Sequence, residues 1–517
     1  MTTSTIGFLA LALLCTATLA QAQQPLTLAD ATARALARNT DIRIARDDVE
    51  AASARELSAN GSYDLRLHAE GGDHYHRDPI TTLFSGAPPG SLSPWENDLT
   101  SLVSLTQLFK SGATASASAS VARDTTNNVF TLFEPAFLTS LGAQVRQPLM
   151  RGFRTDTART NLTITALDRS RSGAVLDQQI QDAVAAVERA YWALISAQRE
   201  VSVRQASVDL AEQQRIDTQA RIDARTAAAL DIAQPVAEIE RRRGDLLTAQ
   251  EAAARAERTL KLLMTDDPGD PLWSQMLVPS DPVEVDTTRV DIQRALADAA
   301  SHRPELSALG ADVSVADAQV ALAKDNVRPQ VDLVAGYTMR GLAGGKNLGV
   351  LAFFPGSPTD PPTPLAGDLI TSWRSMVDQT FPDASVAVQV DIPFGRRQAK
   401  GDLGVAVVQQ RQASVRLQQT RDRVMVEVLN AATALETAAG RIQAARAGLQ
   451  AANTQLQAEQ ERFTAGTSTN FLVLTRQNDL AQAQLTEISA ATQYRQALAD
   501  FARATGMILV DRGITVK

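Results

Sequence analysis

Apolar residues recur every three or four positions between residues 424 and 456, without a slip. The series consists of Val424, Val428, Ala431, Leu435, Ala438, Ile442, Ala445, Leu449, Ala452 and Leu456. An apolar period of about 3.5 residues predicts a long helix that supercoils left-handedly with a neighbour. Large and small side chains alternate along this series, so a partner helix can approach closely at each alanine.

The same series occurs earlier in the chain, which indicates an internal duplication. Stepping back 241 positions from Val428 onward gives Val187, Ala190, Leu194, Ala197, Val201, Arg204, Val208, Ala211 and Arg215, and Ile222 continues the series. Large and small residues alternate in the same phase, but arginine replaces an apolar residue at two positions. Either Arg204 and Arg215 weaken the apolar packing there, or their side chains extend to a wet face.

The duplication divides the chain into four predicted parts. These are a signal peptide (1–22), a first repeat (23–275), a second repeat (276–510) and a short C-terminal tail (511–517).

An export signal is predicted from an apolar run that is too short to span a membrane comfortably. The run covers residues 6–20, and Ala20-Gln21-Ala22 forms an A-x-A cleavage signature. We expect no lipidation at Cys15, because the large residue Leu14 precedes it. Cleavage after Ala22 removes the single cysteine, which suits an oxidising compartment.

Each repeat is expected to open with a helix, a turn and a longer helix. The first set covers residues 26–60 with a break at 39–42, and the second covers 291–326 with a break at 303–306. Further on, a helix over 155–223 would be about 100 Å long, whereas the return helix over 230–264 is about half as long. The short return helix, stacked end to end with the opening helix, would restore the full length.

Four segments alternate between apolar and polar residues, as strands with one wet face do. They cover residues 63–76, 138–147, 330–337 and 384–392, with Gly- and Pro-rich loops at 78–94 and 341–364. Strands of this length between long loops are typical of a membrane β-barrel. A half-buried soluble sheet shows the same alternation, but the export signal and the lack of a later run of 18 apolar residues favour the barrel.

The first repeat has an additional hairpin at residues 99–109 and 113–121. The sequence does not decide whether this hairpin joins the barrel.

Composition and motifs exclude several classes of function. Aromatic residues make up only 4% of the chain, which favours long helices packed side by side over a rounded core. The net charge of −8 argues against nucleic acid as a partner. The chain has no phosphate-binding G-x-x-x-x-G-K-[ST], no H-E-x-x-H and no G-x-S-x-G motif, so we expect no enzyme and no cofactor.

His74 and His76 lie two residues apart on a predicted strand, so both side chains would share one face. Metal binding is possible there. Since no carboxylate or thiol cluster is nearby in the sequence, we expect a position at the barrel rim and no metal site.

The most specific residues follow the strands and form the second helical turn. They are Gln147-Pro148-Leu149, Ile392-Pro393-Phe394 and the turn Arg462-Phe463-Thr464-Ala465-Gly466-Thr467-Ser468. In their order, spacing and duplication they resemble the TolC family of outer-membrane efflux proteins over essentially the whole mature chain. The resemblance implies an α+β membrane protein with two tandem repeats of strands and long coiled-coil helices. It also implies a homotrimer with an outer-membrane β-barrel continuous with a periplasmic α-helical barrel.

By this resemblance the chain is expected to be a passive channel in the outer membrane of a Gram-negative bacterium. It would serve a tripartite efflux or type I secretion system, with a periplasmic adaptor (membrane fusion) protein and an inner-membrane RND or ABC transporter as partners. The alternative is a secreted or surface coiled-coil protein with a structural or adhesive role. Two features argue against this alternative. Strands interrupt the helices at matching points of both repeats, and the helices turn back on themselves.

The resemblance places the helical turns around residues 224–231 and 465–475 at the periplasmic tip. The hairpins that contact the adaptor carry a small apolar residue, then glycine, then threonine or leucine. Ala465-Gly466-Thr467 fits this pattern, whereas Ala224-Arg225-Thr226 has Arg225 in place of glycine.

At the constriction, Asp231 occupies the position of the family's first tip aspartate. The second-repeat equivalents, Leu472 and Thr475, are not acidic. The double acidic ring of the family is therefore absent or rebuilt around an apolar constriction at Leu472. Asp231 has a second interpretation, as a carboxylate that binds free N–H groups at a helix N-terminus.

Overall fold

The computed structural model describes residues 25–82, 84–226, 228–283, 290–350 and 358–514. The predicted signal peptide and Cys15 lie outside the described residues. The chain forms two compact units, and each contains segments of both repeats. The helical unit consists of Met1–Glu50, Ser170–Gly310 and Val415–Lys517, and the sheet unit consists of Ala51–Arg169 and Ala311–Ser414.

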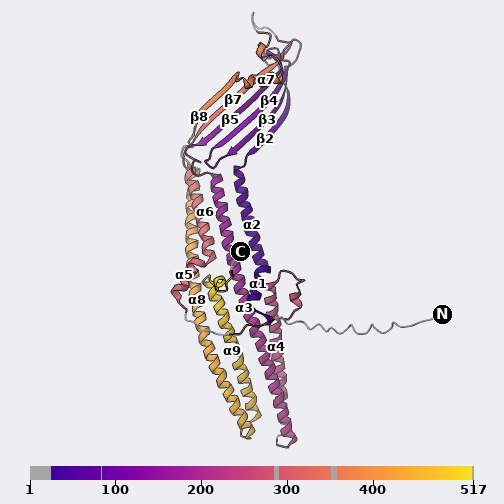
Figure 1. Cartoon of the computed structure of the whole chain (residues 1–517), viewed down its shortest axis with the longest axis vertical. Coiled ribbons are helices and arrows are strands. Elements are labelled where there is room, and N and C mark those ends of the chain that lie inside the picture. Colours follow the sequence, from indigo (N-terminus) through magenta and orange to yellow (C-terminus); the bar gives the residue numbers. More distant parts are fainter. Residues whose placement is uncertain (1–24, 83, 227, 284–289, 351–357, 515–517) are drawn as a thin grey trace, which may run out of the picture. The chain divides into compact units, whose positions relative to one another are not determined.

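The sheet unit contains one six-stranded sheet in which every neighbouring pair is antiparallel (Figure 1). In spatial order the strands are β2 (Arg66–Arg77), β3 (Trp95–Leu108), β4 (Thr114–Thr126), β5 (Phe133–Pro148), β7 (Gln330–Lys346) and β8 (Phe381–Asp391). The additional hairpin of the first repeat is β3 and β4, and it lies inside the sheet between β2 and β5.

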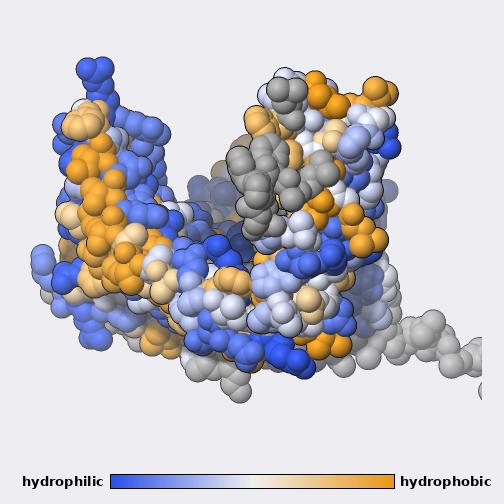
Figure 2. All heavy atoms as spheres, turned by 90° about the horizontal axis from the view of Figure 1, so that it is seen from above, coloured by the Kyte–Doolittle hydropathy of each residue, from blue (hydrophilic) through white to orange (hydrophobic). Residues whose placement is uncertain are grey.

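The two faces of the sheet differ in polarity, because alternate residues of a strand point to opposite faces. One face exposes a set of large apolar side chains, Leu67, Leu99, Val103, Leu105, Leu141, Val145, Leu333, Tyr337, Val386, Val388 and Val390. The other face carries polar residues such as Glu70, Ser104, Ser118, Thr338 and Asp383. Figure 2 shows a contiguous hydrophobic area on the left of the view, whereas hydrophobic and hydrophilic residues are mixed on the right. An apolar face of this extent is suited to lipid.

One helix of the sheet unit was not predicted. The loop expected at 341–364 is wrong at its start, because β7 continues to Lys346, and helix α7 (Leu369–Val377) follows further on. α7 packs against β5 and β7, where Thr139 Oγ1 lies 3.0 Å from Ser372 Oγ. A Cβ atom on Gly341 would come within 2.0 Å of the Ser372 carbonyl oxygen, so glycine permits this close approach.

The opening helices break where the sequence predicts. α1 (Leu28–Arg38) and α2 (Thr40–Asn60) are separated at Asn39, and α5 (Ile292–His302) and α6 (Pro304–Asn326) at Arg303. Thr27 and Asp291 cap the first helix of each set through their side-chain oxygens. Pro304 begins α6, where a proline needs no intrahelical N–H partner.

The long helices form two hairpins, one from each repeat (Figure 1). The first pairs α3 (Thr157–Asp223) with α4 (Ala233–Met264), and the second pairs α8 (Arg397–Thr464) with α9 (Asn470–Ala504). Most residues of the two predicted apolar series are buried, among them Val187, Leu194, Ala211, Val428 and Ile442. The predicted tandem α+β architecture is thus confirmed.

The remaining elements are short. They are β1 (Pro25–Leu26), which pairs in parallel with β6 (Val278–Pro279), the helix α10 (Ile508–Asp511), and the 3-10 turns η1 (Gly61–Tyr63), η2 (Ala229–Ile232), η3 (Pro271–Ser274) and η4 (Thr363–Leu365). Within the described part of the chain, α6 is the one helix long and apolar enough to cross a membrane by length and composition. In the sheet unit its residues Val320 and Ala323 pack with Ala406 of α8.

Candidate functional site

The turns that end α3 and α8 have the same backbone structure. The Thr226 N–H donates to the Arg221 carbonyl at 2.9 Å, and the Thr467 N–H donates to the Arg462 carbonyl at 2.9 Å. Each threonine hydroxyl also donates to the same carbonyl. In each turn the N–H of one residue thus donates to the carbonyl five residues earlier, and this bond defines a Schellman motif. The 241-position equivalence of the two repeats therefore holds at the turns, and it makes Leu472 the counterpart of Asp231.

The Schellman motif requires a left-handed residue, which is usually glycine. Gly466 fills this position in the second hairpin with a φ of 76°, and Arg225 fills it in the first with a φ of 61°. The exposed side chains of Arg225, Thr226 and Thr467 lie at these turns. The substitution of arginine for glycine therefore leaves the backbone geometry unchanged.

The two hairpins touch near their tips. The Arg221 guanidinium of α3 lies over the Phe463 ring of α8, 3.9 Å from its centroid, and it donates to the Phe463 carbonyl at 3.3 Å. Gln214 of α3 donates to Asn470 of α9 at 2.5 Å. A cation over an aromatic face contributes about 0.5–1 kcal/mol when exposed and more when desolvated. These contacts join the first repeat to the second within one chain.

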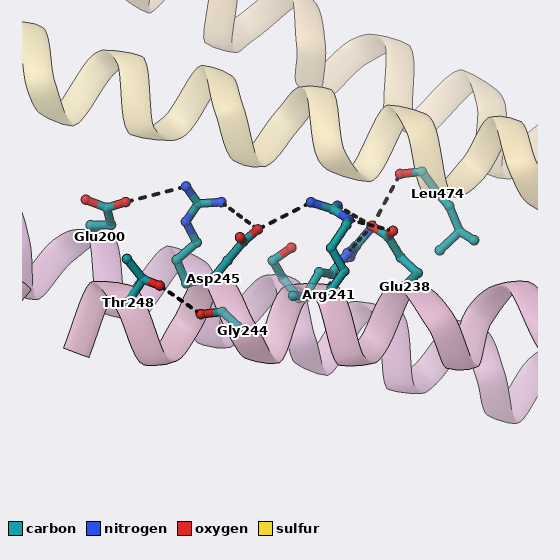
Figure 3. A network of polar contacts seen from close by, with 10 residues as sticks. Glu200, Glu238, Arg241, Gly244, Asp245, Thr248 and Leu474 are labelled. Atoms are coloured by element: carbon teal, nitrogen blue, oxygen red, sulfur yellow. Dashed lines mark hydrogen bonds and ion pairs between the residues drawn. The ribbon is translucent and has the colours of Figure 1, made fainter. Parts of the chain in front are cut away.

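A buried arginine strengthens this connection further from the turns. Arg242 of α4 is almost fully buried, and it binds Glu238 at 2.7 Å and the Ser207 carbonyl of α3 at 2.7 Å. It also donates to the Gln477 side-chain oxygen of α9 at 3.4 Å. Another bond runs to the carbonyl of Leu474, which Figure 3 labels, at 3.4 Å. A buried charge needs such a full set of partners. Arg242 thus holds α3, α4 and α9 together.

The arginines of the first apolar series extend to carboxylates. Arg204 approaches Glu200 at 3.5 Å and Asp245 at 3.4 Å, and Arg215 binds Glu212 at 2.8 Å. Figure 3 shows the ion pairs of Glu200, Asp245, Arg241 and Glu238 as a row along the helices. The sequence allowed two interpretations of Arg204 and Arg215. The structure agrees with the second, in which these side chains extend towards polar surroundings.

The predicted constriction residues belong to different hairpins of the single chain. Asp231 is exposed in η2, and its carboxylate accepts the Ala228 N–H at 3.1 Å. Leu472 is exposed in the first turn of α9, and the Thr475 hydroxyl donates to the Phe471 carbonyl at 2.8 Å. Among these described residues, no hydrogen bond joins Asp231 to Leu472 or Thr475. The interpretation of Asp231 as a helix N-terminal carboxylate is thus realised in the single chain, and its role in a constriction stays a prediction.

Sequence reasoning missed the contacts that join the hairpins. Arg241-Arg242-Arg243 resembles a solvated charge run, and only Arg242 turns inward. Arg242 lies three residues after Ile239, which is also buried, so the two residues share one helical face. This spacing is weak evidence in the sequence that Arg242 is buried.

Comparison with known proteins gives a family match for part of the chain and a fold match for most of it. Residues 295–507 match the family model described as outer membrane efflux protein. No curated protein sequence matches the chain. Similar solved structures include the Campylobacter jejuni CmeC outer membrane channel, at 14% identity and a TM-score of 0.65, covering 93% of this chain and 86% of that one.

Two further solved structures have the same fold. The outer membrane protein VceC from Vibrio cholerae is 14% identical with a TM-score of 0.62, over 93% of this chain and 96% of that one. The open state of the Neisseria gonorrhoeae MtrE outer membrane channel is 19% identical with a TM-score of 0.61, over 93% and 89%.

These findings confirm the resemblance to the TolC family that the sequence analysis identified. The family match lies within the second repeat, and over 93% of its length the chain has the fold of solved outer-membrane channels.

Proposed function

We propose that three copies of this chain form one passive duct of a tripartite efflux or type I secretion system. The observation that carries this proposal is the six-stranded sheet with two free edges. Residues of the edge strands β2 and β8 are almost all exposed, and their outer backbone groups have no strand partner among the described residues. Unpaired edges beside an apolar face are unfavourable in lipid, and closure into a barrel removes them.

Strand direction supports closure by copies of the same chain. The strands alternate in direction along the sheet, so β8 of one copy runs antiparallel to β2 of the next. Three sheets of six strands give eighteen strands in the closed barrel. Barrel diameter grows with strand number, and barrels of about 16–18 strands enclose an aqueous channel. Under this proposal, the β3–β4 hairpin widens the outer-membrane pore.

The contacts between the two hairpins provide a gate. Near the tips, Arg221 contacts Phe463 and Gln214 contacts Asn470. Further from the turns, Arg242 binds α9, so these contacts together hold the two repeats. Separation of the hairpins at this interface would open the duct, as a shift between two packings that a partner biases. A periplasmic adaptor would bind the turn with Gly466 and Thr467, and an inner-membrane RND or ABC transporter would supply the energy.

The first experiment is unheated gel electrophoresis of the purified outer-membrane protein, followed by conductance in planar bilayers. We expect a heat-sensitive trimer that forms pores. A monomer without conductance would overturn the proposal in favour of a coiled-coil structural or adhesive protein.

Deletion of the β3–β4 hairpin tests the barrel itself. Removal of Trp95–Thr126 leaves β2 next to β5 in antiparallel orientation and four strands in each copy. Electron microscopy of the trimer should then show a barrel narrower by about one third. An unchanged barrel diameter would exclude the hairpin from the barrel wall.

A further inference from the structure

Two histidines and an aspartate meet on the polar face of the sheet, near the loop that follows β2. Ligand atoms of His74, His76 and Asp98 all lie within 4.8 Å of one another. His74 is the direct register partner of Asp98 across β2 and β3. His76 lies two residues further along β2, on the same face. We propose that these three side chains bind a divalent transition-metal ion, with Zn²⁺ as the representative ligand.

This cluster corrects the expectation from the sequence that no carboxylate lies near the histidines. Asp98 comes from the next strand, across the loop 78–94, and the antiparallel register brings it beside His74. Asp98 is distant from both histidines in sequence, so only the strand register reveals its position.

Two atoms of the cluster are buried without a hydrogen-bond partner. They are Nδ1 of His76 and Oδ1 of Asp98. A buried polar atom left without a partner costs about 1–3 kcal/mol, and both atom types are good metal ligands. The other ring nitrogen of His76, Nε2, lies 3.5 Å from Glu96 and 3.8 Å from Asp78. A carboxylate that holds one imidazole nitrogen while the other faces a metal is the usual support for a histidine ligand.

The surrounding charge favours a cation. Glu96 is the register partner of His76, and Asp124 is the register partner of Asp98, so three carboxylates share this part of the polar face. A divalent ion would relieve their mutual repulsion. Two imidazoles with one carboxylate suit Zn²⁺ and similar ions, whereas Mg²⁺ and Ca²⁺ prefer oxygen ligands alone.

Binding requires a small rearrangement. Tetrahedral Zn²⁺ with bonds of about 2.0–2.1 Å holds its ligand atoms about 3.3 Å apart, so the side chains must close by roughly 1–1.5 Å. The His74 side chain is exposed, and its ring stacks on His76 with centroids 5.1 Å apart. Rotation of His74 can therefore complete the site, with water as the fourth ligand.

The test is Zn²⁺ binding by the purified full chain, in competition with a chromophoric zinc chelator. We expect one Zn²⁺ per chain, and at least a 10-fold loss of affinity in His76→Gln and in Asp98→Asn. His68→Gln is the matched control, because His68 lies on the same face of β2 but pairs with Glu70 and is not part of the cluster. This control should bind like the wild type.

A ligating variant separates coordination from folding. Asp98→Cys replaces one zinc ligand by another and should retain affinity that Asp98→Asn loses, while unheated gel mobility stays unchanged in all variants. The proposal is overturned if the wild type binds no Zn²⁺, or if His76→Gln and Asp98→Asn bind as the wild type does. Bound metal is the readout, so the result does not depend on conductance.

Discussion

Arg225 and Gly466 occupy the same left-handed position in the turns of the two helical hairpins, with φ angles of 61° and 76°. A residue with a Cβ atom pays about 1–2 kcal/mol for this conformation, and glycine does not. The first turn keeps its geometry because the Thr226 N–H still binds the Arg221 carbonyl. The first tip is therefore strained where the second is relaxed.

Arg225→Gly should stabilise the first turn by about 1 kcal/mol, because it removes the left-handed strain. Hydrogen exchange of the Thr226 amide, which donates the closing bond of the turn, measures the effect. Arg225→Ala is the control, because it removes the guanidinium but keeps a Cβ atom. Equal protection in both variants would show that the arginine side chain, and not its backbone, determines the stability of the turn.

Removal of the Arg221–Phe463 contact should favour the open duct. Arg221→Met keeps an extended side chain but loses the cation over the ring and the bond to the Phe463 carbonyl. We expect a larger fraction of open channels in planar bilayers, and a similar effect from Phe463→Leu. The double variant should add little beyond either single variant, because both remove the same contact. Fully additive effects would contradict a shared gate contact.

The elements were predictable where the signal was local. The helix breaks at Asn39 and Arg303 and the alternating strands each depend on residues close in sequence. The duplicated apolar series predicted both long hairpins for the same reason. The strand limits were less accurate, since β7 extends to Lys346.

The missed features depend on contacts between distant segments. Helix α7 has only nine residues and follows a Gly- and Pro-rich stretch. The spacing of its apolar residues is too short a pattern to predict the helix or its packing on Gly341. Asp98 beside His74 requires the strand register, and the inward position of Arg242 requires the neighbouring hairpin. Such contacts leave no pattern in one sequence.

Asp231→Asn separates the two roles considered for this residue. Asparagine keeps a side-chain oxygen that can accept the Ala228 N–H, so the local turn should persist. If Asp231 lines the constriction of the proposed trimer, loss of its three negative charges should lower the preference of the pore for cations. Reversal potentials in a salt gradient measure this preference. An unchanged reversal potential would limit Asp231 to its local hydrogen bond.

Leu472→Asp is the converse change at the equivalent position of the second repeat. It adds a carboxylate where the sequence departs from the acidic ring of the family, and it should increase cation preference. A variant with unaltered selectivity would place Leu472 outside the constriction.

The stability of the helical unit should depend on acid through Asp270. Its carboxylate accepts the Leu272 N–H at 2.9 Å, and it binds Arg34 at 2.7 Å and Arg38 at 2.9 Å. The Leu272 amide and the Arg34 guanidinium hold the pKa of Asp270 at about 2. The ordinary pKa of an aspartate is about 3.9, so the folded state binds the proton more weakly than the unfolded state. The stabilisation is complete above about pH 4, and it is lost as the pH falls through about 2.

Thermal unfolding of the wild type and of Asp270→Asn, followed from pH 6 to pH 2, tests this dependence. Asparagine retains an acceptor for the Leu272 N–H but loses the ionic partner of Arg34 and Arg38. The difference between the two unfolding midpoints should be largest above pH 4 and should shrink towards pH 2, because protonation makes the wild-type side chain neutral as well. A difference that stays constant over this range would mean that geometry, and not the charge of Asp270, ties α1 to the start of η3.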